Sequence, residues 1–291
     1  MNLSQNELSK ICYHLRQKFP SNIIKIFGGS IHNAWKLDFP GCSVFIKKNI
    51  RKKKLLKFEQ HCLKNLIKYT NPENLIVPKV LGYLLIENTE LLILEWIVLG
   101  NHDQRLLGKG LAELHLKSQE NSPGSYGYPI HGFIGTSNQI QGWDANWGDF
   151  FINYRLEPQL NNLKNNPLGE ENLVGIKSQI KRKLFGHQPI KSLVHGDLWS
   201  GNIGIDGRNK GVIYDPACWW ADPEVDISMS SLFGGFNQEF YEEYEKIIPK
   251  KEGYEDRQII YNFYHILNHA NMFGGIYLQQ VNDYVELILN F

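Results

Sequence analysis

Two short apolar runs in the second half of the chain flank a polar segment rich in turn-forming residues. Ile203-Gly-Ile205 and Val212-Ile-Tyr214 lie on either side of Asp206-Gly-Arg-Asn-Lys-Gly211. This pattern predicts a β-hairpin. In an antiparallel hairpin, the residue before the first strand and the residue after the second lie at the same open end. We therefore expect Asn202 and Asp215 to be neighbours.

The first hundred residues change from strand-like alternation to helical spacing. Phe27 to Trp35 predicts a strand, a glycine turn and a second strand, and Ser43 to Lys47 predicts the next strand. Leu91 to Ile97 predicts a buried strand that leads to a glycine-bearing crossing near Gly100. Between these strands, five apolar positions share one helical face: Leu55, Phe58, Cys62, Leu63 and Leu66.

This order of elements predicts an α+β fold with two lobes. Residues 1–99 would form a small antiparallel sheet with one prominent helix. Residues 100–291 would form a larger, mostly helical lobe that carries the hairpin.

Composition and charge favour a small ligand over a polyanion. The 291 residues are 42% hydrophobic, and the formal net charge is only +1, so no global field attracts nucleic acid or an anionic membrane. Seven of the eleven residues from Lys47 to Lys57 are basic, but a solvated loop and helix start is the commoner meaning of such a run. We expect no nucleic-acid partner.

The chain shows no sign of secretion or membrane insertion. Its four cysteines are scattered without a C-x-x-C pair, which indicates neither a zinc knuckle nor a disulfide framework. The N-terminus lacks a signal-peptide pattern, and Glu95 interrupts the longest apolar run. We expect a cytoplasmic protein without a membrane partner.

The strongest chemical signal surrounds the predicted hairpin. Leu193-Val-His-Gly-Asp-Leu-Trp-Ser-Gly-Asn202 precedes it, and Asp215-Pro-Ala217 follows it. A kinase catalytic loop needs an Asp for the acceptor hydroxyl, then an Asn and a second Asp for magnesium. Asp197, Asn202 and Asp215 occur in this order. We predict that Asp197 orients or deprotonates the hydroxyl and that Asn202 and Asp215 bind Mg²⁺; the alternative is a surface turn and an ordinary strand end.

A lysine and a glutamate in the first lobe predict a phosphate clamp. Glu59 falls inside the apolar helical stripe, where a carboxylate is costly unless it is paired. Lys47, at the end of the preceding strand, is a natural partner. Such a strand-lysine and helix-glutamate pair orients the phosphates of ATP in kinases. The alternative is that Glu59 reaches water from the edge of the stripe.

Two further segments are candidates for contacts with ATP. Gly28, Gly29 and Ser30 lie in the predicted glycine turn and would approach the phosphates, although two glycines alone are a weak signal. The adenine would lie against the backbone of Glu95, Trp96 and Ile97. We therefore expect residues 1–99 to be the nucleotide-binding lobe and residues 100–291 to be the catalytic and acceptor-binding lobe.

With these motifs, the chain resembles the fructosamine kinase family (fructosamine-3-kinases or ketosamine-3-kinases), which belongs to the aminoglycoside phosphotransferase-like group with a protein-kinase-like fold. The likeness runs nearly end to end. The most specific segments are His195 to Asn202 and Leu232-Phe-Gly-Gly-Phe236. Further matches are Gly108 to His115, Phe133-Ile-Gly135, Trp147 to Phe151, Arg155-Leu156, Asp222-Pro-Glu-Val-Asp226 and Leu267 to Tyr277.

The resemblance implies an ATP- and magnesium-dependent enzyme that phosphorylates the third hydroxyl of the sugar in fructosamines, ribulosamines or related ketosamines. The phosphorylated adduct breaks down and frees the amine, which is a deglycation repair. The partners would be small-molecule ketosamines or glycated lysines on proteins, and the protein would be a monomer or a weak homodimer.

Two positions depart from the family pattern. The family's glycine loop often contains a cysteine linked to redox-sensitive dimerisation, and this chain has Ser30 there. Gln141 stands where an asparagine is expected. Redox control and sugar preference therefore stay open.

The acceptor site has several candidates. Trp219 and Trp220 follow the metal-binding segment, and Trp199 lies inside the catalytic loop; each offers a flat face to a sugar or a protonated amine, or packs beneath the loop. Asp222 and Glu224 would hold the amine or anchor the loop. We expect Asp226 to be the structural anchor.

Two other functions compete with this interpretation. A related small-molecule kinase, acting on an aminoglycoside, choline, homoserine or methylthioribose, would share the catalytic loop. A non-catalytic nucleotide-binding scaffold would keep the fold but not the turnover. His265 and His269 stand four residues apart, a spacing that can bind zinc, but no glutamate occupies the position of a metalloprotease base.

Overall fold

An antiparallel sheet of five strands forms the N-terminal part of the protein, in the order β1-β2-β3-β6-β5. The computed structural model describes residues 2–27, 32–50, 54–163 and 168–291. The sheet strands are β1 (Asn22–Ile26), β2 (Asn33–Phe39), β3 (Cys42–Asn49), β5 (Val80–Ile86) and β6 (Thr89–Glu95). The short strands are β4 (Leu75–Ile76), β7 (Tyr126–Gly127), β8 (Gly132–Ile134), β9 (Ser137–Gln139), β10 (Trp143–Asp144), β11 (Ser192–Val194), β12 (Ile203–Ile205), β13 (Gly211–Ile213) and β14 (Trp219–Ala221).

Helices dominate the C-terminal part. Helices α1 (Gln5–Leu15) and α2 (Leu55–Leu66) belong to the N-terminal part, and α3 (Arg105–Gln119) is the first helix after it in the described chain. Those that follow are α4 (Trp147–Phe151), the π-helical turn η1 (Ile152–Leu156), α5 (Glu157–Asn162), α6 (Gly169–Leu184), the 3-10 turn η2 (Ser200–Asn202), α7 (Glu224–Leu232), α8 (Gln238–Glu245), α9 (Tyr254–Phe273) and α10 (Ile276–Leu289). No helix in the described part of the chain is both long and apolar enough to span a bilayer.

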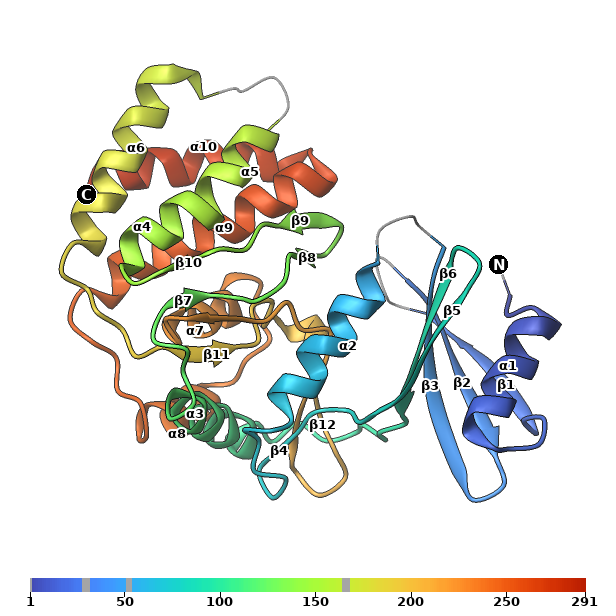
Figure 1. Ribbon diagram of the computed structural model, residues 1–291. Helices are drawn as coiled ribbons and strands as arrows, with labels where there is room; N and C mark the ends of the chain where they lie inside the picture. The colour runs from blue at the N-terminus through green and yellow to red at the C-terminus, as the bar shows by residue number, and fades with distance from the viewer. Residues whose placement is uncertain (1, 28–31, 51–53, 164–167) are drawn as a thin grey trace.

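Helices α1 and α2 cover opposite faces of the sheet (Figure 1). Because successive side chains of a strand point to opposite faces, Leu91 and Ile93 of β6 pack with α1, whereas Leu92 and Leu94 belong to the core that includes α2. In the register of β3 with β6, Lys47 is opposite Leu92. Lys47 therefore emerges on the α2 face, which is the face toward the C-terminal part.

The predicted hairpin is confirmed. Strands β12 and β13 are antiparallel, with Ile203 opposite Ile213, and the amide of Tyr214 donates to the carbonyl of Asn202 over 3.0 Å. The predicted strand at 43–47, the helix beginning at Leu55 and the strand at 91–97 correspond to β3, α2 and β6.

Two contacts tie the N-terminal chain to the hairpin. Strand β4 pairs with β13 in parallel, with Gly211 opposite Leu75, and Leu99 forms an antiparallel bridge with Asp206. The fold is thus the two-lobed α+β arrangement expected from the sequence, while the division at residue 99 stays a prediction.

Helix α9 lies at the centre of the helical part and packs against α7, α10, α5 and α6. Its buried aromatic side chains meet those of α4, and Trp147 stacks on Trp219 of β14 with ring centroids 5.7 Å apart. This packing supports β14 and β11, the strands on either side of the catalytic segment.

Candidate active site

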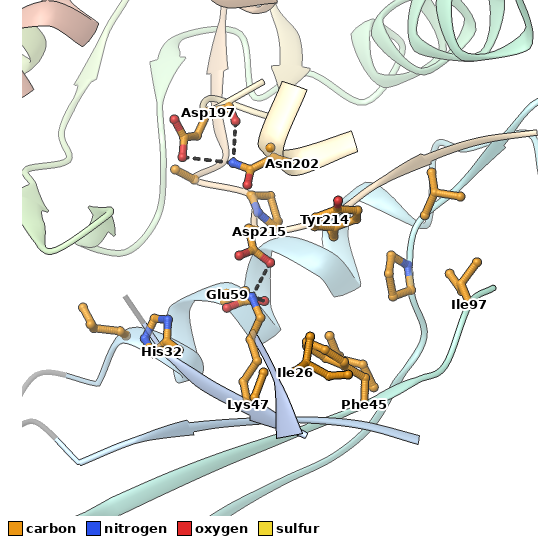
Figure 2. A pocket seen from close by; sticks show the side chains of 18 of the residues that line it. Ile26, His32, Phe45, Lys47, Glu59, Ile97, Asp197, Asn202, Tyr214 and Asp215 are labelled. Carbon is orange, nitrogen blue, oxygen red and sulfur yellow. Dashed lines mark hydrogen bonds and ion pairs between the residues drawn. The ribbon is translucent and has the colours of Figure 1, made fainter. Parts of the chain in front are cut away.

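A cavity of about 500 Å³ lies between the N-terminal sheet and the β12–β13 hairpin. Figure 2 shows charged and amide side chains along one line of the cavity, with Ile26, Phe45 and Ile97 to one side of them. The polar set consists of Lys47, Glu59, Asp197, Asn202 and Asp215, all of which line the cavity. Residues that lie up to 168 positions apart in the chain are thus brought to one place.

Lys47 bridges two carboxylates across the cavity. Its Nζ lies 2.7 Å from Oε1 of Glu59 and also contacts Oδ1 of Asp215. Lys47 and Glu59 are buried, whereas the Asp215 side chain is 41% exposed. The predicted pairing of Lys47 with Glu59 is therefore present, and the direct contact of Lys47 with Asp215 was not foreseen from the sequence.

Burial and the neighbouring charges shift the pKa values of Glu59 and Lys47. Burial raises the pKa of the Glu59 carboxyl to about 7, although Lys47 acts in the opposite direction. Burial disfavours the ammonium of Lys47, but Asp215 and Glu59 outweigh burial and hold its pKa above the usual range. With both carboxylates ionised, one ammonium faces two anions, so the group of three side chains carries a net charge of about −1.

Backbone bonds position Asp215. Its φ of 60° is in the left-handed region, which aspartate tolerates better than most residues, and it turns the chain away from β13. The next residues are held because the amide of Ala217 donates to the carbonyl of His195 over 2.8 Å. Pro216 fixes its own φ, so the segment that carries Asp215 is restrained on both sides.

Asp197 and Asn202 form a second polar pair. The Nδ2 of Asn202 donates to the carbonyl of Asp197 over 2.8 Å and to its Oδ2 over 3.1 Å (Figure 2). Burial, and then the charge of Asp215, raise the pKa of the Asp197 carboxyl to about 7. The site thus contains a carboxylate whose proton affinity suits proton transfer near neutral pH.

Asp226 holds the loop that presents Asp197. Its carboxylate accepts from the amides of His195 and Gly196 over 2.7 and 2.8 Å, and lies 3.1 Å from Nε2 of His115. Although burial acts against it, hydrogen bonding and charge from His115 keep the pKa of Asp226 below its usual value. These contacts place Asp226 in the anchoring position expected from the sequence.

The donor set fits Mg²⁺ and a nucleotide phosphate. The amide nitrogen of Asn202 is used by Asp197, which leaves Oδ1 of Asn202 as the atom available to a cation. Asp215 supplies carboxylate oxygens with excess negative charge nearby. Magnesium in kinases takes a few such oxygens from the protein and the rest from phosphate and water. Lys47 lies beside Asp215, as a phosphate clamp requires.

The predicted nucleotide segments are only partly described. Glu95, Trp96 and Ile97 line the cavity together with apolar side chains that suit a flat ring. Gly28, Gly29 and Ser30 lie outside the described residues. Tyr214, Phe133 and Gly135 also line the cavity. The sequence placed Tyr214 in the hairpin and the other two in a family segment, but it did not predict them as site residues; for Tyr214, its place just before Asp215 was an available signal.

The tryptophans predicted for the acceptor separate into two groups. Trp199 lines the cavity. Trp219 is fully buried, stacks on the rings of Trp147 and Phe150, and is covered by the guanidinium of Arg155 at 3.9 Å. Trp220 is also buried, and its ring meets Tyr69 edge-on. Neither Trp219 nor Trp220 lines the cavity in the described residues, so the packing alternative accounts for both.

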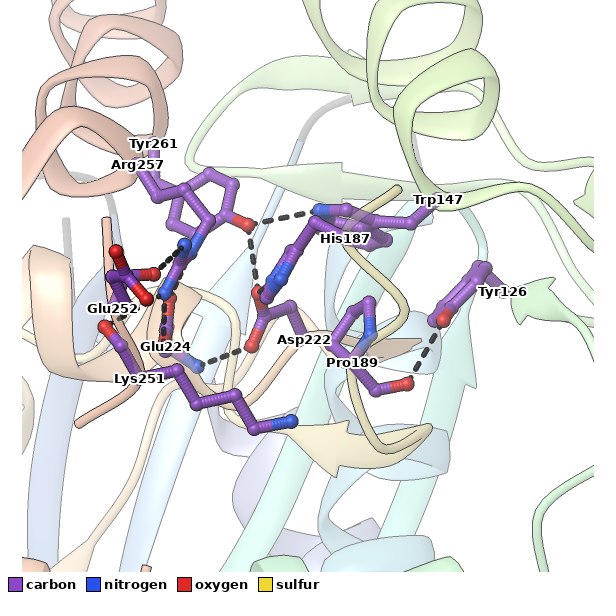
Figure 3. Close-up of polar contacts among 10 residues, drawn as sticks. All are labelled: Tyr126, Trp147, His187, Pro189, Asp222, Glu224, Lys251, Glu252, Arg257 and Tyr261. Atoms are coloured by element: carbon purple, nitrogen blue, oxygen red, sulfur yellow. Dashed lines mark hydrogen bonds and ion pairs between the residues drawn. The ribbon is translucent and has the colours of Figure 1, made fainter. Parts of the chain in front are cut away.

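Asp222 and Glu224 are also absent from the described cavity wall and belong to a separate buried network (Figure 3). Asp222 accepts from the hydroxyl of Tyr261 over 2.7 Å and lies 2.6 Å from Nε2 of His187. Glu224 receives two hydrogen bonds from Arg257, of 2.6 and 2.9 Å. Because these partners occupy both carboxylates, the geometry does not support the prediction that they hold the amine of the acceptor.

Comparison with known proteins agrees with this geometry. Residues 5–291 match the sequence model of the family described as fructosamine kinase. A probable ketoamine kinase of Vibrio parahaemolyticus is 33% identical over 272 residues, which cover 92% of each chain.

Two solved structures share the fold. A protein provisionally named fructosamine-3-kinase, from Haemophilus somnus, has a TM-score of 0.87 at 28% identity, with 99% of this chain and 100% of that chain covered. A thermostable mutant of the aminoglycoside phosphotransferase APH(4)-Ia, in a ternary complex with ADP and hygromycin B, has a TM-score of 0.67 at 12% identity, with 97% of each chain covered. The chain belongs to the fructosamine kinase family and is a kinase, that is, a phosphotransferase.

Proposed function

We propose that this protein transfers the terminal phosphoryl group of ATP to the third hydroxyl of the sugar in ketosamines. The observation that carries the proposal is the convergence of Lys47, Glu59 and Asp215 with Asp197 and Asn202 in one cavity. The name of the Vibrio relative, a probable ketoamine kinase, supports the class of acceptor.

Each polar residue has a role in this proposal. Lys47, held by Glu59, binds phosphate oxygens, and Asn202 and Asp215 bind Mg²⁺ through their side-chain oxygens. When bound, the metal neutralises charge on the phosphates and fixes their position. Asp197 orients the acceptor hydroxyl and accepts its proton, and Asp226 keeps Asp197 in place through the amides of its loop.

The remaining nucleotide contacts follow the same scheme. The adenine would lie on the apolar side of the cavity, against the backbone of Glu95, Trp96 and Ile97. Gly28, Gly29 and Ser30 would cover the phosphates. Residues 1–99 would then act as the nucleotide lobe, and residues 100–291 would supply the metal ligands, Asp197 and the acceptor site.

The biological role that fits this chemistry is deglycation repair. Phosphorylation next to the ketone of the sugar gives an adduct that breaks down and frees the amine, as the resemblance to the family implies. The acceptors would be small ketosamines or glycated lysines of proteins.

The direct experiment measures magnesium-dependent ATP turnover by the purified protein with ribulose-lysine, fructose-lysine and aminoglycosides. We expect turnover with the ketosamines and its loss in Asp197→Asn. Turnover with an aminoglycoside alone would favour the related small-molecule kinase. Normal ATP binding without turnover of any acceptor would contradict the ketosamine assignment and favour the scaffold.

A further inference from the structure

A continuous set of aromatic rings extends from the cavity onto the C-terminal helices. Trp199, in the cavity wall, meets Phe233 edge-on at a centroid distance of 6.2 Å. Phe233 lies 4.8 Å from His269 of α9 and 6.5 Å from Tyr277 of α10. Phe273, at the end of α9, lies 5.7 Å from His269 and 6.1 Å from Tyr277. We call Phe233, His269, Phe273 and Tyr277 the aromatic wall.

Two further contacts join the segments that carry the aromatic wall to residues beside the cavity. The amide of Thr136 lies 3.4 Å from the sulfur of Met272 in α9, and its neighbour Gly135 lines the cavity. Gly235, two residues after Phe233, lies against Ser200 of the catalytic loop; a Cβ at this glycine would lie only 2.5 Å from the Cβ of Ser200. The wall is therefore joined to both the β8–β9 turn and the loop that carries Asp197.

The wall is not sealed inside the core. Phe273 is 54% exposed, and the other three members are half-buried. Exposed aromatic surface that continues from a ligand cavity is the kind of surface that binds part of a ligand. The packing of the helices accounts for the inner edges of the rings but not for the exposed ring of Phe273.

The wall carries no positive charge at neutral pH. The Nδ1 of His269 lies 2.9 Å from the carbonyl of His265, so Nδ1 carries the proton and Nε2 is left as an acceptor. Burial lowers the pKa of His269, and burial lowers that of His265 behind it to about 3. Neutral aromatic rings attract an alkylammonium group through their faces, whereas an imidazolium would repel it.

We propose that the aromatic wall binds the protonated amine of the acceptor and the alkyl substituent that the amine carries, while the sugar lies at Asp197. This inference rests on the proposed ketosamine kinase function and adds a subsite to it. The wall gives the enzyme a preference for a cationic nitrogen over a neutral atom at the same position of the acceptor. Because Phe273 is exposed, the substituent can extend from the cavity toward solvent.

The test compares two acceptors that share one sugar: ribulose linked to butylamine, and the ether in which oxygen replaces the amine nitrogen. The variants are Phe273→Ala and Tyr277→Leu, with Phe185→Ala as a control because Phe185 is 87% exposed and lies outside the described cavity wall. We expect each wall variant to lower kcat/KM for the amine about five- to tenfold, mainly through KM. The ether should lose about twofold or less.

Several results would overturn the inference. An equal loss for both acceptors in the wall variants would show that the wall only supports the loop, and an unchanged KM for the amine would show that the wall does not touch it. If the wild-type protein phosphorylates neither acceptor, the proposed function is wrong. In that case, calorimetry with a non-hydrolysable ATP analogue tests separately whether the wall binds the amine, by measuring the binding of both acceptors to wild-type protein and wall variants. Binding of the amine to wild type that is lost in the wall variants would support the inference. No such binding would contradict it.

Discussion

Replacing Asp197 by asparagine should lower activity and raise stability at the same time. The substitution keeps the shape of the side chain, and the amide oxygen can still accept from Nδ2 of Asn202, which now lies 3.1 Å from Oδ2 of Asp197. What disappears is a negative charge close to Asp215. Catalysis requires that charge on Asp197, but the same charge destabilises the folded state.

The stability gain follows from the pKa of Asp197, which rises from 3.8 to about 7 in the folded protein. Because the folded pKa lies above the unfolded one, ionisation disfavours the folded state. The cost is absent below about pH 4, grows as the pH rises and is complete above about pH 7. A shift of this size corresponds to at most about 4 kcal/mol. Since Asp197 is partly exposed to the cavity, we expect a gain of about 1–2 kcal/mol.

The assay has two parts. Urea unfolding at pH 8 and pH 4.5, with a chelator and without nucleotide, should show Asp197→Asn to be more stable than wild type at pH 8 and to have a clearly smaller advantage at pH 4.5. Turnover with ATP, magnesium and a ketosamine should fall by about 10² to 10⁴. Asp283→Asn, at an exposed position of α10, is the control and should change neither quantity.

The reasoning would be refuted by a variant that is less stable than wild type at pH 8, or by a stability difference that does not depend on pH. Turnover within threefold of wild type would show that Asp197 does not handle the acceptor hydroxyl.

Three further predictions test other parts of the site and its support. Glu59→Gln leaves Lys47 with Asp215 alone, so kcat/KM for ATP should fall about 10²-fold; steady-state kinetics that show no rise in KM for ATP would contradict the clamp. Asp226→Ala removes the acceptor of two loop amides and should destabilise the protein by about 3 kcal/mol; a loss below about 1 kcal/mol in urea unfolding would argue against the anchor. His265 is fully buried, and its ring nitrogens have no hydrogen-bond partner in the described structure. Burial lowers its pKa from 6.5 to about 3. Between these pH values only the unfolded state binds the proton, so the free energy of unfolding is highest above about pH 6.5 and falls as the pH is lowered. Relative to His265→Leu, the wild type should lose about 2 kcal/mol between pH 8 and pH 5; parallel pH profiles of unfolding would contradict this.

Local patterns were enough to predict the elements that carry the chemistry. The hairpin followed from two apolar runs and a polar turn, and it fixed the proximity of Asn202 and Asp215. The pairing of Lys47 with Glu59 followed from the cost of an unpaired carboxylate in an apolar stripe. In both cases, the information lies within about fifteen residues of the chain.

What the sequence did not show depends on contacts between distant segments. Trp219, in β14, is buried against Trp147, Phe150 and Arg155, which lie more than 60 residues earlier in the chain, so it became core rather than a surface for the sugar. The partners of Asp222 and Glu224 lie between 33 and 39 residues away. The parallel pairing of β4 with β13 joins positions 136 residues apart. No local pattern predicts such pairs.

The central claim is tested most directly by the rate of phosphorylation of ribulose-lysine by the purified protein with ATP and magnesium, with the product analysed for the position of the phosphate. We predict a magnesium-dependent product with phosphate on the third carbon of the sugar, absent with Asp197→Asn. Phosphate on another carbon, or no product from this and the fructose-linked acceptor, would contradict the account.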